Sequence, residues 1–211
     1  SIVMPISANE LKFLTEHIKK YNAGLVAVSK TKTVEEIQAV YDMGQRDFGE
    51  NRVSELREKE PLLPNDIQWH AIGNLQRNKV KYMAPFVSLI HGVDSLKLLK
   101  EINKQGQKIV RKLSCLLQVH IAEESSKFGF DDEELEVLTS SGELDNLEYV
   151  TVSGLMGMAT FTTDMEQVRR EFRGLKLLFD KLRERLPKLE ILSMGMSGDY
   201  CQAIQEGATM V

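Results

Sequence analysis

The feature that most constrains the fold is the regular alternation of short apolar runs with amphipathic helical stretches along all 211 residues. Apolar runs of strand length lie at residues 24–29, 47–50, 67–73, 87–93, 113–121, 147–158, 189–196 and 209–211. Helical stretches lie at residues 7–21, 33–44, 51–60, 75–83, 95–105, 131–139, 165–186 and 197–206. Because a helix separates each strand from the next, the pattern predicts parallel strands joined by helical crossovers.

Two architectures have this pattern: an open doubly wound sheet and a closed (β/α)8 barrel. No G-x-G-x-x-G motif follows the first apolar run, so the dinucleotide-binding form of the open sheet has no motif support. Eight units within 211 residues fit the lower end of the barrel range. We therefore predict a (β/α)8 TIM-type barrel in a single domain over residues 1–211, with an eighth strand that begins at Thr209 and is cut short at Val211.

Composition narrows the class of protein. The formal net charge of -4 argues against a general nucleic-acid binder, which normally carries a basic surplus. Cys115 and Cys201 form no C-x-x-C pair, which fits a reducing cytoplasm better than a disulfide framework. The sequence has no signal-length N-terminal apolar run and nothing near the ~20 apolar residues of a membrane helix, so we expect a cytoplasmic protein.

The first apolar run leads directly into Lys30, within A-V-S-K-T-K. Active sites of such barrels lie at the carboxyl ends of the strands, so Lys30 is expected at the mouth. Burial there would lower the pKa of its amine from about 10.4 and let it form a Schiff base with an aldehyde. The alternative is that Lys30 only extends into solvent. Lys32, two residues further on, is expected to be exposed.

A second candidate site is M-G-M-S-G-D, residues 194–199, where Ser197 and Gly198 are expected to open the last helix. A helix N-terminus binds phosphate through free N–H groups, and barrels often hold phosphate after strands seven and eight. The alternative is that Ser197 only caps the helix. Asp199 stands where a G-x-S-x-G nucleophile motif requires glycine, so that motif is absent.

Three histidines, His70, His91 and His120, fall near expected strand ends and could serve a metal-dependent barrel hydrolase. The sequence has neither H-x-H nor H-E-x-x-H, so this reading is disfavoured and no metal is predicted. The charged residues within 51–60 and 165–186 are expected to form solvated helix faces.

Taken together, the motifs resemble those of a known family. They are A-V-S-K-T-K (27–32), F-G-E-N (48–51), W-H-A-I-G-N-L-Q-R-N-K (69–79), S-S-K-F-G-F (125–130), V-S-G-L-M-G-M (152–158) and L-S-M-G-M-S-G-D (192–199). In this order they resemble the pyridoxal phosphate homeostasis protein family, whose fold resembles the N-terminal barrel of alanine racemase. The resemblance covers nearly the whole chain.

The resemblance implies that the barrel binds pyridoxal 5'-phosphate (PLP), the vitamin B6 cofactor. Lys30 matches the family's Schiff-base lysine, Asn51 a residue beside the cofactor ring, and Ile72 an apolar residue that packs on the ring. Met196 and Ser197 match the segment that reaches toward the phosphate. The family has no established catalytic turnover. The resemblance therefore implies a cytoplasmic, monomeric carrier or regulator of PLP that affects amino-acid and keto-acid balance. PLP-dependent apoenzymes are the partners that it implies.

Two further points follow from the resemblance. A PLP-dependent amino-acid racemase of the same fold, acting through Lys30, is the alternative function, although no tyrosine lies at an expected strand end to act as a second base. The family pattern also continues beyond Val211 with an arginine and a glycine-rich turn that contributes phosphate-binding amides. The 211-residue chain is therefore expected to bind PLP weakly.

Overall fold

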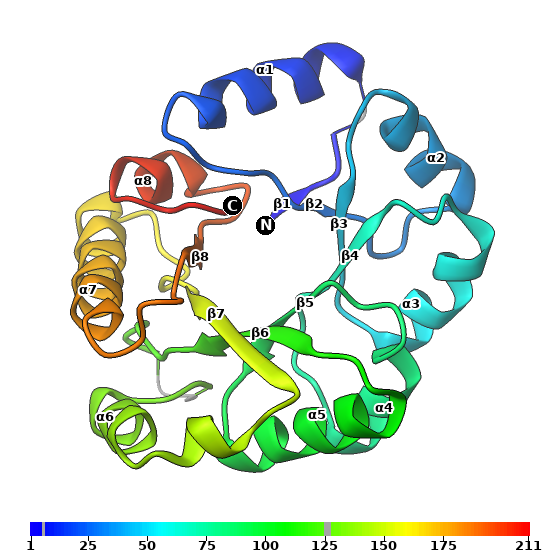
Figure 1. Ribbon diagram of the computed structural model, residues 1–211. Coiled ribbons are helices and arrows are strands. Elements are labelled where there is room, and N and C mark those ends of the chain that lie inside the picture. The colour runs from blue at the N-terminus through cyan, green and yellow to red at the C-terminus, as the bar shows by residue number, and fades with distance from the viewer. Residues whose placement is uncertain (6, 125–127) are drawn as a thin grey trace.

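A computed structural model describes residues 1–5, 7–124 and 128–211. In these residues eight parallel strands form one sheet in the order of the sequence, curled into a ring with the helices on its outside (Figure 1). The strands are β1 (Ile2–Val3), β2 (Ala27–Val28), β3 (Asp47–Glu50), β4 (Gln68–Ala71), β5 (Leu89–Val93), β6 (Leu113–Gln118), β7 (Val150–Gly157) and β8 (Ile191–Met194). The predicted barrel, rather than an open sheet, is confirmed.

Helices follow the strands in turn. The α-helices are α1 (Ala8–Lys19), α2 (Val34–Asp42), α3 (Val53–Lys59), α4 (Val80–Met83), α5 (Leu96–Ile109), α6 (Asp132–Ser140), α7 (Met165–Arg183) and α8 (Tyr200–Gln205). Short 3-10 helices lie at η1 (Glu60–Leu62), η2 (Arg77–Lys79) and η3 (Glu143–Asn146). Each predicted helical stretch contains a helix, and the bounds differ by a few residues, which is the usual uncertainty at helix ends.

The ring closes through two short segments that lie end to end along one edge of β2. Residues 209–211 form hydrogen bonds to the segment that leads into β2 and to β8. The Val26 N–H donates to the Val211 carbonyl, and the Thr209 N–H donates to the Leu192 carbonyl, each at 2.9 Å. Further along the same edge, β1 pairs with β2 in parallel. The predicted eighth strand at 209–211 therefore forms isolated bridges rather than a full strand. The first strand, β1, was not predicted, so the lysine-bearing strand β2 is the second rather than the first.

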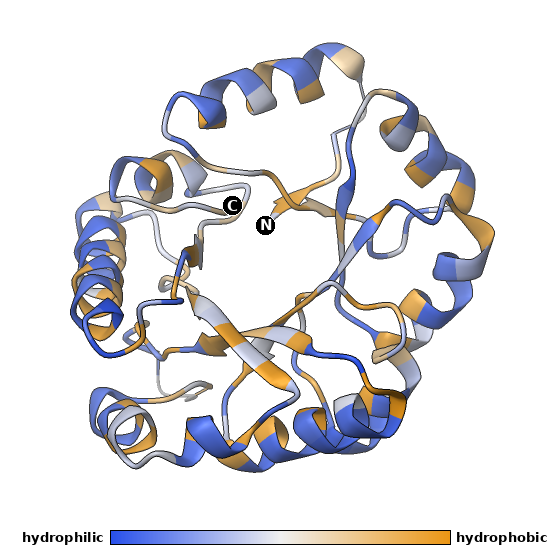
Figure 2. Cartoon of the chain, in the orientation of Figure 1, coloured by the Kyte–Doolittle hydropathy of each residue, from blue (hydrophilic) through white to orange (hydrophobic). Residues whose placement is uncertain are grey.

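The core lies between the ring and the helices. Apolar stripes of the helices face the strands, and their polar faces point outward (Figure 2). On α7 the buried apolar stripe is Val168, Phe172, Leu175, Phe179 and Leu182. A capping box begins α2: Thr33 Oγ1 accepts from the Glu36 N–H, and the Glu36 carboxylate accepts from the Thr33 N–H.

In the described part of the chain, no helix is both long enough and apolar enough to cross a membrane.

Candidate functional site

Three of the predicted site residues, Lys30, Asn51 and Ile72, lie in one row at the carboxyl ends of β2, β3 and β4. The sheet register pairs Val28 with Gly49 and Gly49 with His70. Lys30, Asn51 and Ile72 each follow one of these paired residues by two positions, so all three lie at the same end of the ring. The loops are joined as well, since the Ile72 N–H donates to the Glu50 carbonyl at 3.0 Å.

Two glycines allow these loops to approach each other. A Cβ added at Gly49 would lie 3.0 Å from Ile72 Cδ1, so the Ile72 side chain leans over β3. A Cβ added at Gly73 would lie 2.5 Å from the Asn51 carbonyl oxygen, a backbone atom that cannot move aside alone. The exposed Asn51 and half-buried Ile72 are thereby brought together beside Lys30.

Lys30 is exposed, as in the alternative in which it extends into solvent, and Lys32 is half-buried, contrary to its expected exposure. The reason is the local backbone: Lys30 and Thr31 are the two central residues of a tight turn, closed by a 3.1 Å bond from the Lys32 N–H to the Ser29 carbonyl. This turn projects Lys30 outward from the strand end. Its amine has no hydrogen-bond or ion-pair partner among the described residues, so it is available to a ligand.

A buried charged cluster, which the sequence reading missed, lies beneath this turn. Lys59 on α3 is 7% exposed, although the charges of 51–60 were predicted to be solvated. Its Nζ donates to the Ser29 carbonyl at 2.8 Å, to Glu50 Oε2 at 2.8 Å and to Glu55 Oε2 at 2.9 Å. The i,i+4 spacing of Glu55 and Lys59 was visible in the sequence, but a surface pair has the same spacing.

Glu50 is the most deeply buried member of this cluster, with no exposed surface. Burial raises the pKa of its carboxyl, and hydrogen bonds from Lys59 and Ser29 partly offset that effect. Both donors contact Oε2, whereas Oε1 has no partner in the described structure. A lysine and a carboxylate thus lie together directly under the turn that carries Lys30.

The other two predicted residues, Met196 and Ser197, follow β8 and are exposed. The alternative that Ser197 caps the last helix is wrong, because Asp199 takes the N-cap position of α8. The Asp199 carboxylate accepts from the Met196 N–H at 2.7 Å. Ser197 Oγ instead accepts from the Val3 N–H at 3.0 Å, so β1 lies between this segment and β2. Within the described residues the N–H groups of Ser197 and Gly198 have no protein acceptor, which leaves them free for an anion.

The histidines do not form the three-ligand cluster that a metallohydrolase would need. His70 and His91 lie inside β4 and β5 rather than at their ends, and His70 Nδ1 is 2.9 Å from His91 Nε2. His120 lies beyond β6 and bonds through its backbone to Phe130. In the part of the chain that the structure describes, no three metal-ligating side chains are grouped to hold an ion.

The hydrogen bonds assign the tautomers of this histidine pair. Asp47 Oδ1 accepts from His70 Nε2, so in a neutral His70 ring the Nδ1 atom is the acceptor for His91 Nε2. His91 Nδ1 then faces the Ser193 hydroxyl at 3.5 Å. Complete burial, and next the neighbouring His70, hold the pKa of His91 well below 6.5.

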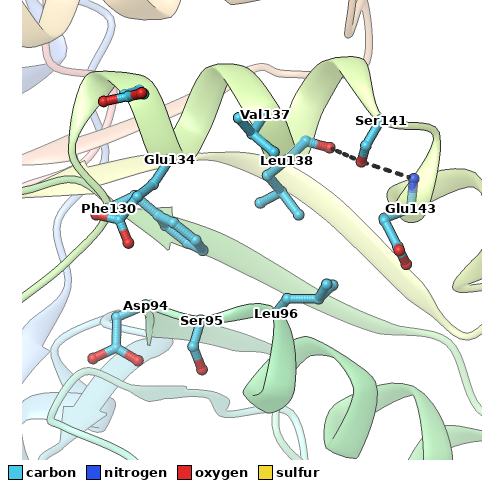
Figure 3. A pocket seen from close by; sticks show the side chains of 10 residues that line it. Asp94, Ser95, Leu96, Phe130, Glu134, Val137, Leu138, Ser141 and Glu143 are labelled. Carbon is cyan, nitrogen blue, oxygen red and sulfur yellow. Dashed lines mark hydrogen bonds between the residues drawn. The ribbon is translucent and has the colours of Figure 1, made fainter.

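A separate groove of about 560 Å³ lies between the β5–α5 junction and α6, away from the predicted residues. Figure 3 shows Phe130, Leu138 and Leu96 facing one another across it. None of the five predicted site residues lines this groove. The S-S-K-F-G-F motif runs into it at Phe130, but its residues 125–127 lie outside the described residues.

The arrangement at the mouth is an exposed primary amine beside an amide and an apolar side chain, with free backbone N–H groups on the other side of β1. Residues 7–211 match the family model described as alanine racemase, N-terminal domain. The fold and this site thus define a racemase-type barrel with a lysine at its mouth.

Relatives identify the family more closely. The chain is 43% identical over 192 residues to the pyridoxal phosphate homeostasis protein of Aquifex aeolicus, covering 90% of this chain and 83% of the relative. It is 36% identical over 214 residues to that of Helicobacter pylori, covering 100% of this chain and 92% of the relative. The chain belongs to the pyridoxal phosphate homeostasis protein family.

Solved structures agree with this assignment. PipY from Synechococcus elongatus, solved without PLP, superposes with a TM-score of 0.89 at 32% identity, covering 98% of this chain and 96% of PipY. PipY with PLP bound gives 0.86 at 31% identity over 96% and 95% of the two chains. Alanine racemase of Clostridium difficile gives 0.75 at 19% identity, covering 96% of this chain but 54% of the racemase, and shows the shared fold alone.

Proposed function

We propose that residues 1–211 act as a single PLP-binding barrel domain, with the cofactor held at the mouth by Lys30. The observation that carries this proposal is the unpartnered, exposed Lys30 amine on a turn aligned with Asn51 and Ile72. PLP, when bound, supplies an aldehyde that reacts with amines and a phosphate group that needs N–H donors. Lys30 Nζ would hold the cofactor by condensing with the aldehyde, with the carbonyl oxygen released as water.

The remaining residues give the ligand its orientation. Asn51 offers an amide that can donate or accept a hydrogen bond, and Ile72 offers an apolar surface for an aromatic ring. The exposed N–H groups of Ser197 and Gly198 receive the phosphate, with Met196 lining that side of the mouth. PipY, which shares 31% identity with this chain, has been solved with PLP bound.

We propose a carrier or regulator of PLP supply rather than an enzyme. Relatives at 36% and 43% identity are named pyridoxal phosphate homeostasis proteins, a name that describes cofactor supply rather than catalysis. Tyr200 opens α8 after β8, but its ring packs against His17 of α1 at 5.9 Å between centroids. To act as a base on a ligand beside Lys30, Tyr200 would have to give up this contact with His17.

The cellular setting is part of the same proposal. Cys115 and Cys201 are both free thiols, which suits a reducing cytoplasm. We propose that the protein works there as a monomer and delivers PLP to PLP-dependent apoenzymes.

Absorbance titration with PLP tests the binding proposal. The wild type should develop the band of a lysine–PLP adduct that saturates at one PLP per chain. Lys30→Ala should lose this band, and Lys32→Ala, two residues along the same turn, should keep it. Equal bands in Lys30→Ala and wild type would reject the assignment.

Hydrogen exchange tests the absence of turnover. Alanine or serine incubated in deuterium oxide with the PLP-loaded protein should gain no α-deuterium above a PLP-only control. Lys30-dependent exchange over many turnovers would instead establish the racemase alternative.

A further inference from the structure

The turn that carries Lys30 has a strained backbone. Thr31, its third residue, has φ of +62°. This left-handed conformation is the one that a type II turn requires at that position and that glycine normally provides. It is a marked outlier for a β-branched residue such as threonine. Such strain persists only where neighbouring contacts hold it, so the contacts around Thr31 need an explanation.

Those contacts come from the buried charged cluster on α3. Glu55 Oε2 accepts from the Thr31 N–H at 3.0 Å. Lys59 Nζ bonds to the Ser29 carbonyl, the same oxygen that closes the turn by accepting from the Lys32 N–H. Lys59 also joins Glu55 to the buried Glu50, whose Oε2 accepts from the Ser29 hydroxyl. Both residues that flank Lys30 are therefore fixed to one helix.

The cluster would be an expensive way to stabilise a barrel. A buried ion pair gains little net stability, because desolvation of the two charges offsets most of their attraction. All three Lys59 donors are nevertheless directed at one carbonyl and two carboxylates around this turn. A role in setting the geometry of the turn accounts for that arrangement.

We propose that Lys59, together with Glu55, is a positioning residue that holds the Ser29–Lys32 turn in its strained form and so directs the Lys30 amine toward the ligand. This inference rests on the proposed function, since it takes Lys30 to be the residue that binds PLP. Without the clamp, Thr31 relaxes to negative φ and the Lys30 amine turns away from Asn51 and Ile72.

The experiment measures PLP affinity and the distribution of borohydride-fixed PLP among lysines, both at a temperature where circular dichroism shows a folded protein. Lys59→Met should weaken PLP binding by about tenfold or more, the loss expected when a strained element relaxes, and should spread the label from Lys30 to other lysines. Glu55→Ala should do the same to a smaller extent. Because Glu55 is partly exposed, this variant keeps the fold in case Lys59→Met does not.

Two further variants separate positioning from stability. Thr31→Gly in the Lys59→Met background should recover part of the affinity and of the Lys30 labelling, because glycine adopts positive φ without a clamp. Leu56→Ala removes a fully buried side chain from the same helix and should lower the melting temperature while leaving label on Lys30.

The outcomes are distinguishable. Wild-type labelling without Lys30 would reject the proposed function itself. Wild-type labelling on Lys30, with unchanged affinity and labelling in Lys59→Met and Glu55→Ala, would reject the positioning role alone. Loss in Leu56→Ala as large as in Lys59→Met, or no recovery with Thr31→Gly, would show that the cluster only stabilises the fold.

Discussion

The buried His70–His91 pair makes the stability of the barrel depend on pH in a defined window. The pKa of His91 lies well below its unfolded value of 6.5, because the ring is fully buried and beside His70. Below pH 6.5 the unfolded chain therefore binds a proton that the folded chain does not. The contribution of His91 to stability is complete above that pH and decreases as the pH falls towards the lowered folded-state pKa, by at most about 1.4 kcal/mol for each pH unit.

His91→Gln isolates this contribution. Glutamine does not titrate, its amide can still donate to His70 Nδ1, and its oxygen can accept from Ser193. As the pH falls below 6.5, the unfolding free energy of the wild type should decrease more steeply than that of His91→Gln, by up to about 1.4 kcal/mol for each pH unit, until His91 takes up a proton in the folded barrel. Above pH 7 the difference between the two proteins should be constant, which serves as the internal control.

The assay is urea denaturation followed by circular dichroism across this range of pH. The comparison with His91→Gln cancels the other titrating groups, including Glu50, whose raised pKa acts in the opposite direction. Parallel stability curves for the two proteins below pH 6.5 would refute the reasoning, because His91 would then have to accept a proton in the folded barrel.

Three further predictions concern single residues. Gly73→Ala should weaken PLP binding in the absorbance titration, because the added Cβ would displace the backbone of the neighbouring loop. Gly174→Ala, which has open space around it in α7, should raise the unfolding free energy by up to about 1 kcal/mol. Thr33→Ala should lower the unfolding free energy by about 1 kcal/mol in urea denaturation through loss of the α2 capping box. Burial raises the pKa of Cys115 to about 12, so a thiol reagent at pH 8 should modify the half-buried Cys201 first.

The sequence predicted the barrel because hydrophobic periodicity reports which side of each element is buried. The expected strand at 47–50 coincides with β3, and the helix at 165–186 contains α7. The two-residue strand β1 was not predicted, because it lies in none of the apolar runs identified in the sequence. Its existence depends on bonds to β2 and to Ser197, which are distant in the sequence.

The candidate site was predicted in part. The family motifs pointed to Lys30, Asn51 and Ile72, and the parallel register explains why those three residues are neighbours. The burial of Lys59 could not be predicted, because it depends on acceptors from β3 and from the turn after β2. The expected exposure of Lys32 was wrong because the turn, not the strand, sets the directions of Lys30 and Lys32.

Peptide mass spectrometry after borohydride reduction tests the central claim most directly. The protein is mixed with one equivalent of PLP, reduced, digested and mapped. The account predicts that the phosphopyridoxyl label is concentrated on the peptide containing Lys30, and that in a sample denatured before PLP is added at the same concentration the label is spread over many lysines. Label spread evenly over surface lysines in the native protein would contradict it.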